Sequence, residues 1–255
     1  MATSQKADYG VDAPYAIRNL LLSGLAIIIL CSIFRKVTIG SGTLVLFPGF
    51  LWSGRWIMAS GVMMYLYSKI GKLRHRDRML NQVEWTGREQ ALDVGTGRGL
   101  LLVGAAKRIT TGKAVGIDIW NQEDLSGNNL QNLERNLEVE GVRGKTEIKN
   151  EDAQKMSFPN DTFDVIVSLA CIHNIYNAPG RAQACHEIAR VLKPGGTAII
   201  SDFRHMGEYR ATLAKAGLEV RKLPWRFDSF PPMRILRARK RDNQLALRAG
   251  AIRDA

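Results

Sequence analysis

A glycine-rich turn is the first candidate for chemistry in this sequence. It spans Asp93 to Gly99 and reads DVGTGRG, between the apolar run QALDV and an apolar helical segment. Glycines there let backbone N–H groups approach a ligand at the positive end of a helix. The spacing G-x-G-x-G fits neither the dinucleotide fingerprint nor a Walker loop. A carboxylate at Asp93 would repel a pyrophosphate and would suit a cationic ligand or a ligand amino group.

Two histidines stand where later strands are expected to end. His173 follows the apolar run FDVIVSLA, and His205 follows TAIISDF. Ligands of open α/β sheets bind at the carboxyl ends of the strands. His173 is therefore the first candidate for a general base or a substrate hydrogen bond, and His205 is the second. Helix capping or loop packing is the alternative for each.

The cysteines indicate neither a disulfide framework nor a metal centre. There are three, widely spaced, which favours a reducing compartment. Cys185 and His186 are adjacent on an expected helix and point about 100° apart, and the sequence has no C-x-x-C pair. No metal site is predicted.

These residues must be positioned by an α/β sheet. From about Glu89, short β-branched runs alternate with helical ones, which predicts a mostly parallel sheet covered by helices. The last two runs, LEVRKL and MRILRARK, are separated by a loop with three prolines. They predict an antiparallel pair at the C-terminal edge of the sheet.

The ordered segments resemble the class I, Rossmann-like methyltransferases that use S-adenosylmethionine. Asp93 to Gly99 is similar to the first motif of that family. Asp118, in GIDIW, is similar to its acidic residue that accepts both ribose hydroxyls, and Asp152-Ala153 to its pair that meets the adenine amino group. PNDTFDVIVS and VLKPGG are typical of the branch that includes small-molecule and quinone methyltransferases. The resemblance covers roughly residues 78–240.

The resemblance implies a doubly wound sheet and S-adenosylmethionine as cofactor. Taken singly, the glycines could only shape a turn and Asp118 could only cap a helix. Their ordered occurrence favours the family. Ile119 would give the adenine an apolar face, and Trp120 either joins it or packs on the next helix. The expected cofactor-binding residues are Asp93, Gly95, Thr96, Gly97, Gly99, Asp118, Ile119, Asp152, Ala153 and Leu169.

The N-terminal part of the chain has a different character. Leu20 to Phe34 carries no charge, and Ala16 to Phe34 approaches the length of a bilayer span if Arg18 snorkels. A retained membrane segment is predicted over a signal peptide, because the charged region of a signal peptide should lie near Met1 and the expected cofactor is intracellular.

A second apolar stretch, from Val37 to Ser68, carries one charge, Arg55, and is broken by Pro48 and two glycines. It fits a second span, a re-entrant pair, an interfacial helix, or a helical cap over a substrate pocket. The basic cluster from Lys69 to Arg78 predicts that the catalytic domain lies on the cytoplasmic side. Arg35 and Lys36 favour one span with an interfacial segment over a hairpin.

Charge and domain layout complete the prediction. The net charge is +12, and much of it lies from Arg221 onward. A membrane segment makes anionic lipid the simpler partner of this charge, and no nucleic-acid-binding module accompanies it, which argues against nucleic acid. The expected layout is an N-terminal hydrophobic membrane-anchoring region (1–75), a methyltransferase domain (76–242) and a basic tail (243–255). The oligomeric state is not predicted.

The sequence thus predicts methyl transfer from S-adenosylmethionine to a small lipophilic acceptor at a membrane. The sulfonium methyl is already activated, so the protein mainly aligns the acceptor and excludes water. A covalent role for Cys171 is not needed. The alternatives are a nonenzymatic S-adenosylmethionine-binding scaffold and a nucleic-acid methyltransferase.

Overall fold

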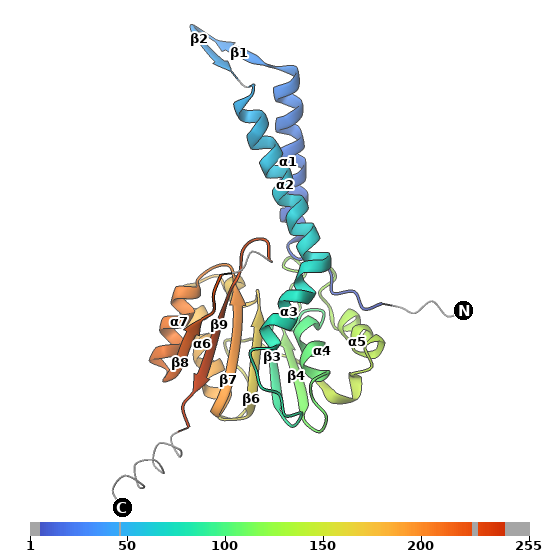
Figure 1. Cartoon of the computed structure of the whole chain (residues 1–255), viewed down its shortest axis with the longest axis vertical. Coiled ribbons are helices and arrows are strands. Elements are labelled where there is room, and N and C mark those ends of the chain that lie inside the picture. Colours follow the sequence, from blue (N-terminus) through green and yellow to red (C-terminus); the bar gives the residue numbers. More distant parts are fainter. Residues whose placement is uncertain (1–5, 46, 226–228, 243–255) are drawn as a thin grey trace, which may run out of the picture.

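The computed structural model describes residues 6–45, 47–225 and 229–242. It consists of an α/β domain and a long helical hairpin that rises from one end of this domain (Figure 1). The expected basic tail, 243–255, lies outside the described residues, as does Arg226 within the basic C-terminal stretch.

A seven-stranded sheet forms the centre of the domain, in the order β5-β4-β3-β6-β7-β9-β8. The strands from β5 to β7 run parallel, and β9 is antiparallel to both β7 and β8. This confirms the predicted doubly wound, mostly parallel sheet with an antiparallel edge pair. The strands are β3 (Gln90–Val94), β4 (Lys113–Asp118), β5 (Thr146–Asn150), β6 (Phe163–Leu169), β7 (Leu192–Asp202), β8 (Leu218–Lys222) and β9 (Arg234–Lys240).

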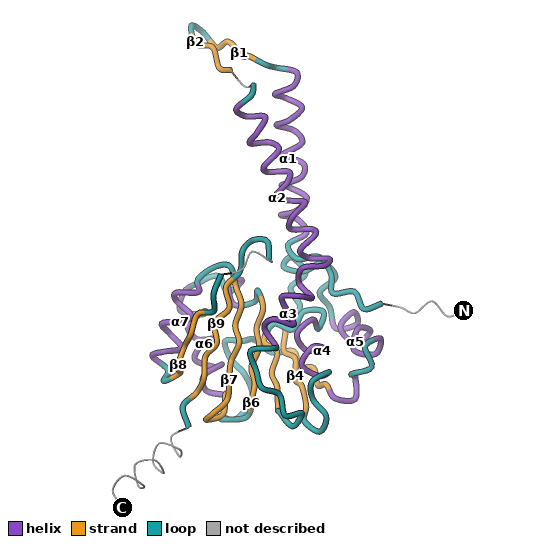
Figure 2. Tube along the Cα trace, in the orientation of Figure 1, coloured by secondary structure: helices purple, strands orange, loops and turns teal. Residues whose placement is uncertain are grey.

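Helices cover both faces of the sheet (Figure 2). One layer contains α3 (Lys72–Leu80), α4 (Leu100–Ala106) and α5 (Leu130–Val139), and the other contains α6 (Ala178–Val191) and α7 (Met206–Lys215). Short helical turns are η1 (Tyr67–Gly71), η2 (Arg143–Lys145) and η3 (Ile172–Asn174).

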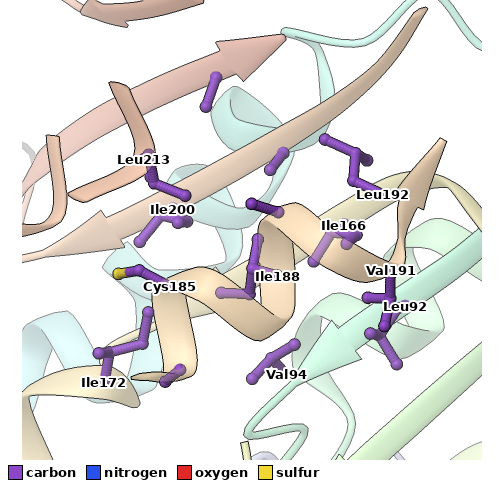
Figure 3. Packing of buried hydrophobic residues seen from close by; sticks show 14 of the residues in the cluster. Leu92, Val94, Ile166, Ile172, Cys185, Ile188, Val191, Leu192, Ile200 and Leu213 are labelled. Atoms are coloured by element: carbon purple, nitrogen blue, oxygen red, sulfur yellow. The ribbon is translucent and has the colours of Figure 1, made fainter. Parts of the chain in front are cut away.

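Alternation along the strands creates two separate cores. Ala91 belongs to the core under α3 and α4, whereas its neighbour Leu92 belongs to the core under α6 and α7. Figure 3 shows Ile188 and Val191 of α6 in the second core, together with Leu92 of β3. Because side chains of a strand alternate between faces, a parallel strand covered on both sides is apolar throughout.

The N-terminal region folds back on itself as an antiparallel helical hairpin, residues 14–66. It comprises α1 (Pro14–Ile33), a two-stranded ribbon of β1 (Lys36–Ile39) and β2 (Gly42–Val45), and α2 (Gly49–Leu66). The ribbon forms the far tip, and both helix ends at the base lie on the α/β domain (Figure 1).

Glycines explain why the two helices pair so closely. A Cβ atom at Gly24 would stand 2.6 Å from the backbone nitrogen of Met58 and 2.8 Å from the carbonyl oxygen of Gly54. A Cβ at Gly61 would stand 3.0 Å from Leu21. The helix backbones therefore approach in a way that larger residues would prevent.

The hairpin differs from the expected single span with an interfacial segment. Among the described residues, α1 is the one helix long and apolar enough by itself to cross a membrane. Arg55, Trp52 and Trp56 make α2 less apolar, but it packs along α1 over its length. Arg35 and Lys36 did not indicate this helix pairing, which follows from the close glycine contacts, and the number of membrane crossings stays a prediction.

Candidate functional site

The glycine turn lies at the carboxyl end of β3, where the strand order reverses between β3 and β6. Gly95 and Gly99 both have positive φ, at 74° and 86°. A Cβ at Gly95 would stand 2.2 Å from the Sγ atom of Cys171, and one at Gly99 would stand 2.5 Å from Leu133. Glycine is required at both positions by conformation and by close approach.

Several N–H groups of this turn already have acceptors within the protein. Those of Gly95 and Thr96 both donate to the carbonyl of Ile117 at 2.9 Å, and that of Gly97 donates to Asp118 Oδ2 at 2.7 Å. These N–H groups are therefore not free donors, and the approach of a ligand to the turn stays a prediction. What the glycines offer a ligand is the close approach of a backbone without side chains.

Asp93 carries a buried carboxylate beside the turn. Its Oδ2 accepts a hydrogen bond from the Thr96 hydroxyl at 2.9 Å, and its side chain is almost inaccessible to solvent. Burial raises the pKa of Asp93 to about 7, against the lowering effect of Thr96 and the Leu102 backbone, and the nearby Asp118 adds to the rise. Oδ1 is buried without a well-formed hydrogen bond within the described part of the chain. A cationic group would satisfy it.

Asp118, at the end of β4, organises the next turn. Besides Gly97, its carboxylate accepts from the backbone of Trp120 at 2.7 Å and from the Asn128 side chain at 3.3 Å. These donors lie in turns and not in the first turn of a described helix, so Asp118 holds the two loops rather than capping a helix. A carboxylate has about four acceptor positions, so three donors leave room for a further hydroxyl.

The other expected cofactor residues lie along the same sheet edge. Ile119 follows β4 and is 64% exposed, whereas Trp120 is partly buried against the α4 side of the core. Asp152 and Ala153 follow β5, and the Asp152 carboxylate accepts from the backbone of Gln154 at 2.8 Å. Leu169 ends β6. Parallel neighbours β5, β4, β3 and β6 bring these residues to one edge.

His173 is held by a carboxylate from the next strand. It lies in η3 after β6, and its Nδ1 is 2.9 Å from Oδ1 of Asp202, the last residue of β7. The His173 backbone N–H also donates to Asp202 Oδ2 at 3.3 Å. Asp202 is 1% exposed and also contacts the Tyr209 hydroxyl at 3.4 Å. The ring and the carboxylate are thus in close contact, without a well-formed hydrogen bond at Nδ1 within the described part of the chain.

Cys171 and His205 have different surroundings. Burial and nearby carboxylates, first Asp118 and then Asp202, raise the pKa of the Cys171 thiol, so it is a poor nucleophile. His205 caps α7 with φ 56°, and its Nδ1 is 3.6 Å from Glu208. Its side chain is 35% exposed, against 15% for His173. Of the two, His173 has the closer and more buried carboxylate.

Sequence reasoning missed the N-terminal segment, residues 6–13, as part of this site. Asp8 pairs with Arg98 of the glycine turn at 3.0 Å. Val11 donates to the Ser126 hydroxyl at 2.7 Å, and Asp12 forms a bridge with Leu125. The segment thus lies across the loop that follows β4. No motif signals these contacts, because they join residues about 90 or more positions apart.

Asp202 was also missed, although a signal existed. β6 and β7 are parallel neighbours, so residues that follow them meet at one edge.

A separate polar hollow lies at the opposite edge, between the starts of β3, β6 and β7 and the end of β9, and includes Glu84, Arg88 and Arg237. It contains none of the predicted site residues. Among the described residues, no group of three His, Cys, Asp or Glu could hold a metal ion.

Comparison with known proteins shows similarity to methyltransferases. Residues 91–196 match the family model described as a methyltransferase domain. The chain is 32% identical over 126 residues to a ubiquinone/menaquinone biosynthesis C-methyltransferase of Hydrogenovibrio crunogenus, covering 49% of this chain and 45% of that protein. It is 33% identical over 140 residues to a sterol 24-C-methyltransferase of Gibberella zeae, covering 53% and 33%. The chain spans about a third to three-fifths of the length of the curated relatives it matches.

A solved structure supports the fold. The S-adenosylmethionine-dependent methyltransferase of Aquifex aeolicus aligns with a TM-score of 0.52 at 21% identity, covering 66% of this chain and 90% of that one. In fold and in residues 91–196, this chain is therefore similar to methyltransferase domains. This similarity implies S-adenosylmethionine as cofactor, and the unsatisfied Asp93 oxygen fits the ammonium group at the amino-acid end of that molecule.

Proposed function

We propose that this protein transfers the methyl group of S-adenosylmethionine to a small lipophilic acceptor, such as a quinone, phenol or lipid, at a membrane surface. Residues 1–75 serve as the anchoring region and 76–242 as the catalytic domain, which faces the cytoplasm. Two of the similar curated proteins, by their names, act on quinones and sterols.

One observation carries the proposal: the base of the helical hairpin meets the sheet at the carboxyl ends of its parallel strands, where the expected cofactor residues lie. We call this the cofactor edge. Tyr67, at the end of α2, donates to the sulfur of Met233 at 3.8 Å, just before β9 begins. His75 of α3 contacts the Ser201 hydroxyl at 2.7 Å, next to Asp202. Because β9 is antiparallel to β7, both contacts lie at the edge that carries the glycine turn. An acceptor in the lipid phase would reach this edge along the hairpin.

Cofactor binding is assigned to residues at the carboxyl ends of β3, β4 and β5. Asp93 would neutralise the cofactor's amino group, and Asp118 and Asp152 would accept from ribose and adenine. Gly95, Gly97 and Gly99 let the ligand approach the backbone. When bound, the cofactor supplies an electrophilic methyl group on sulfonium.

Proton removal is assigned to His173. If the acceptor is a phenol, an amine or an acidic carbon, its proton must leave as the new bond to the methyl carbon forms. Asp202, whose carboxylate lies 2.9 Å from Nδ1, would stabilise the imidazolium that forms when the ring takes that proton. His205 remains the second candidate.

The test is turnover with the purified full-length chain in lipid nanodiscs. Labelled methyl donor is supplied with lipophilic acceptors (demethylated quinones, sterols, long-chain phenols) and with short-chain water-soluble analogues of each. The proposal expects transfer to a lipophilic acceptor and much less to its analogue. Cofactor binding without transfer to any acceptor would favour a scaffold, and transfer to RNA or DNA alone would overturn the assignment.

A further inference from the structure

We infer that the helical hairpin crosses the bilayer twice, placing the β1–β2 tip on the side opposite the catalytic domain. The inference rests on the proposed membrane function and extends it to α2, which by composition alone is not a membrane span.

Both ends of the hairpin are fixed to the same body. Before α1, the N–H of Ala13 donates to the carbonyl of Asp124 at 3.0 Å. After α2, the Lys72 ammonium is buried and donates to the carbonyls of Tyr9 and Gly10 at 2.7 and 2.8 Å. Asp12 and Ser68 exchange two hydrogen bonds at 3.1 Å. Since both ends are on one side, the number of crossings is even, and a single span is excluded.

The surface of the hairpin calls for an apolar solvent on all sides. Within α1 only Ile17, Gly24 and Cys31 are buried, and within α2 only Leu51, Gly54 and Gly61. The outward side chains include Leu22, Ile29, Leu30, Val62, Met63 and Leu66, each between 44% and 58% exposed. An apolar surface that encircles a helix pair exceeds what monomeric soluble proteins expose. Because the helix pair is apolar on every side, lipid acyl chains, which surround it completely, fit this surface.

Length and polar residues fit a full crossing. At about 1.5 Å per residue, helices of 20 and 18 residues are about 30 and 27 Å long, which matches a hydrocarbon core of about 30 Å. Arg18 lies near the base and Arg55 near the tip, so both can reach a head-group region. Arg55 stacks on Trp52 at 5.1 Å, a pairing suited to that interface.

The tip does not fit inside the hydrocarbon. The β1–β2 ribbon has only two strands, so both outer edges leave backbone groups unpaired. It also carries Arg35 and Lys36, against the larger basic cluster at the base. More positive charge at the base than at the tip is the asymmetry that places the base in the cytoplasm.

The test is labelling with a membrane-impermeant maleimide. Full-length variants Ser41→Cys and, as a second tip position, Thr43→Cys are compared with Thr111→Cys, an exposed position on the catalytic domain. The unsubstituted chain, in which Cys31 and Cys185 are buried, gives the background. We expect the tip variants to label in right-side-out vesicles and to lose this labelling in inverted ones, with Thr111→Cys showing the reverse.

The outcomes separate this inference from the proposed function. Tip and domain labelling from the same face would overturn the double crossing, and so would a tip protected on both faces. In either case methyl transfer by the same vesicles would leave the proposed function standing. A detergent-free soluble oligomer, its hairpins covered by other copies of the chain, would overturn the inference and the membrane part of the proposed function together.

Discussion

The carboxylate of Asp93 makes cofactor binding pH-dependent. Its pKa is about 7 in the folded protein, so it is largely neutral near pH 5.5 and gains its charge toward neutrality. Because the charged form attracts the cationic cofactor, affinity should rise between about pH 5 and 7, approaching about tenfold per unit at the lower end. Calorimetric titration across this range measures the slope, and Asp93→Asn should flatten it.

Stability should change in the opposite direction over the same range. The folded-state pKa of Asp93 lies above the ordinary value of 3.8. Between about pH 4 and 7 the folded state therefore binds more protons than the unfolded state, and the contribution of Asp93 to the free energy of unfolding falls as pH rises. An Asp93→Asn variant with the same pH slopes as the parent would contradict both assignments.

Asp118→Ala should weaken cofactor binding by about 2 to 3 kcal/mol, since a charged acceptor of ribose hydroxyls is lost. Asp118 also holds the backbone of Gly97, so part of the loss would reflect a looser turn. Asp161→Ala, a surface carboxylate paired with Lys240 at 2.7 Å, is the matched control for lost charge and should keep full affinity. Unchanged affinity in Asp118→Ala, measured by calorimetry, would sink the ribose assignment.

His173→Ala should lower turnover by about 10²-fold or more while leaving cofactor affinity nearly unchanged, because a proton acceptor is lost and the cofactor side is intact. Asp202→Asn tests electrostatic support: it keeps the shape and removes the negative charge beside the ring, so turnover should fall while cofactor affinity stays nearly unchanged. Full activity of His173→Ala with an inactive His205→Ala would move the role to the start of α7.

At the residue scale, sequence order was enough to propose most of the candidate site but not its pairings. The glycine turn, Asp118 and His173 could be found because motifs and strand ends are local. The Asp202–His173 contact and the Asp8–Arg98 pair could not be read from local patterns, because they depend on which strands become neighbours and where a distant segment lies. Strand adjacency would have been enough to suggest the first pair, but nothing local suggests the second.

At the element scale, the sheet and the hairpin show opposite limits of sequence reasoning. Alternating β-branched and helical runs specified the parallel sheet and its antiparallel edge, because each strand carries its own pattern. Helix pairing has no such pattern. Gly24 and Gly54 look like breaks in an apolar stretch until the backbones they bring together are seen.

Gly24→Val should separate α1 from α2. The added side chain would meet the backbone of Met58 and Gly54 at under 3 Å, and backbone cannot move aside as a flexible side chain can. We expect a loss of about 1 to 3 kcal/mol in the free energy of unfolding of the detergent-solubilised protein. Gly49→Ala, at a position where an added Cβ meets nothing within 4 Å, is the control. Equal stability of the two variants would show that the seam is not tightly packed.

At the scale of the whole molecule, the N-terminal segment connects the hairpin to the cofactor turn. Lys72, after the hairpin, holds the carbonyls of Tyr9 and Gly10, and Asp8 in the same segment pairs with Arg98 between two of the turn's glycines. Tyr9 also donates to Glu140 at 2.8 Å, after α5. The hairpin is thus anchored through the same residues that line the cofactor edge, which keeps the site at a fixed position relative to the hairpin base.

The hairpin itself should be removable without loss of the domain. Asp12 and Ser68 are in direct hydrogen-bond contact, so Ala13 and Tyr67 can be joined by a short Gly-Ser linker that replaces residues 14–66 and keeps the N-terminal segment in place.

The full-length protein should stay in the membrane pellet in high salt or alkaline carbonate, because salt screens the basic cluster but does not weaken burial of apolar helices. The shortened protein should leave the pellet in salt, bind the cofactor with unchanged affinity, and lose turnover of lipophilic acceptors more than of their short-chain analogues. Fractionation, calorimetry and labelled methyl transfer measure these three properties. Release of the full-length protein by salt alone would assign membrane attachment to the basic residues, and a shortened protein that still resists carbonate would place the anchor outside the hairpin.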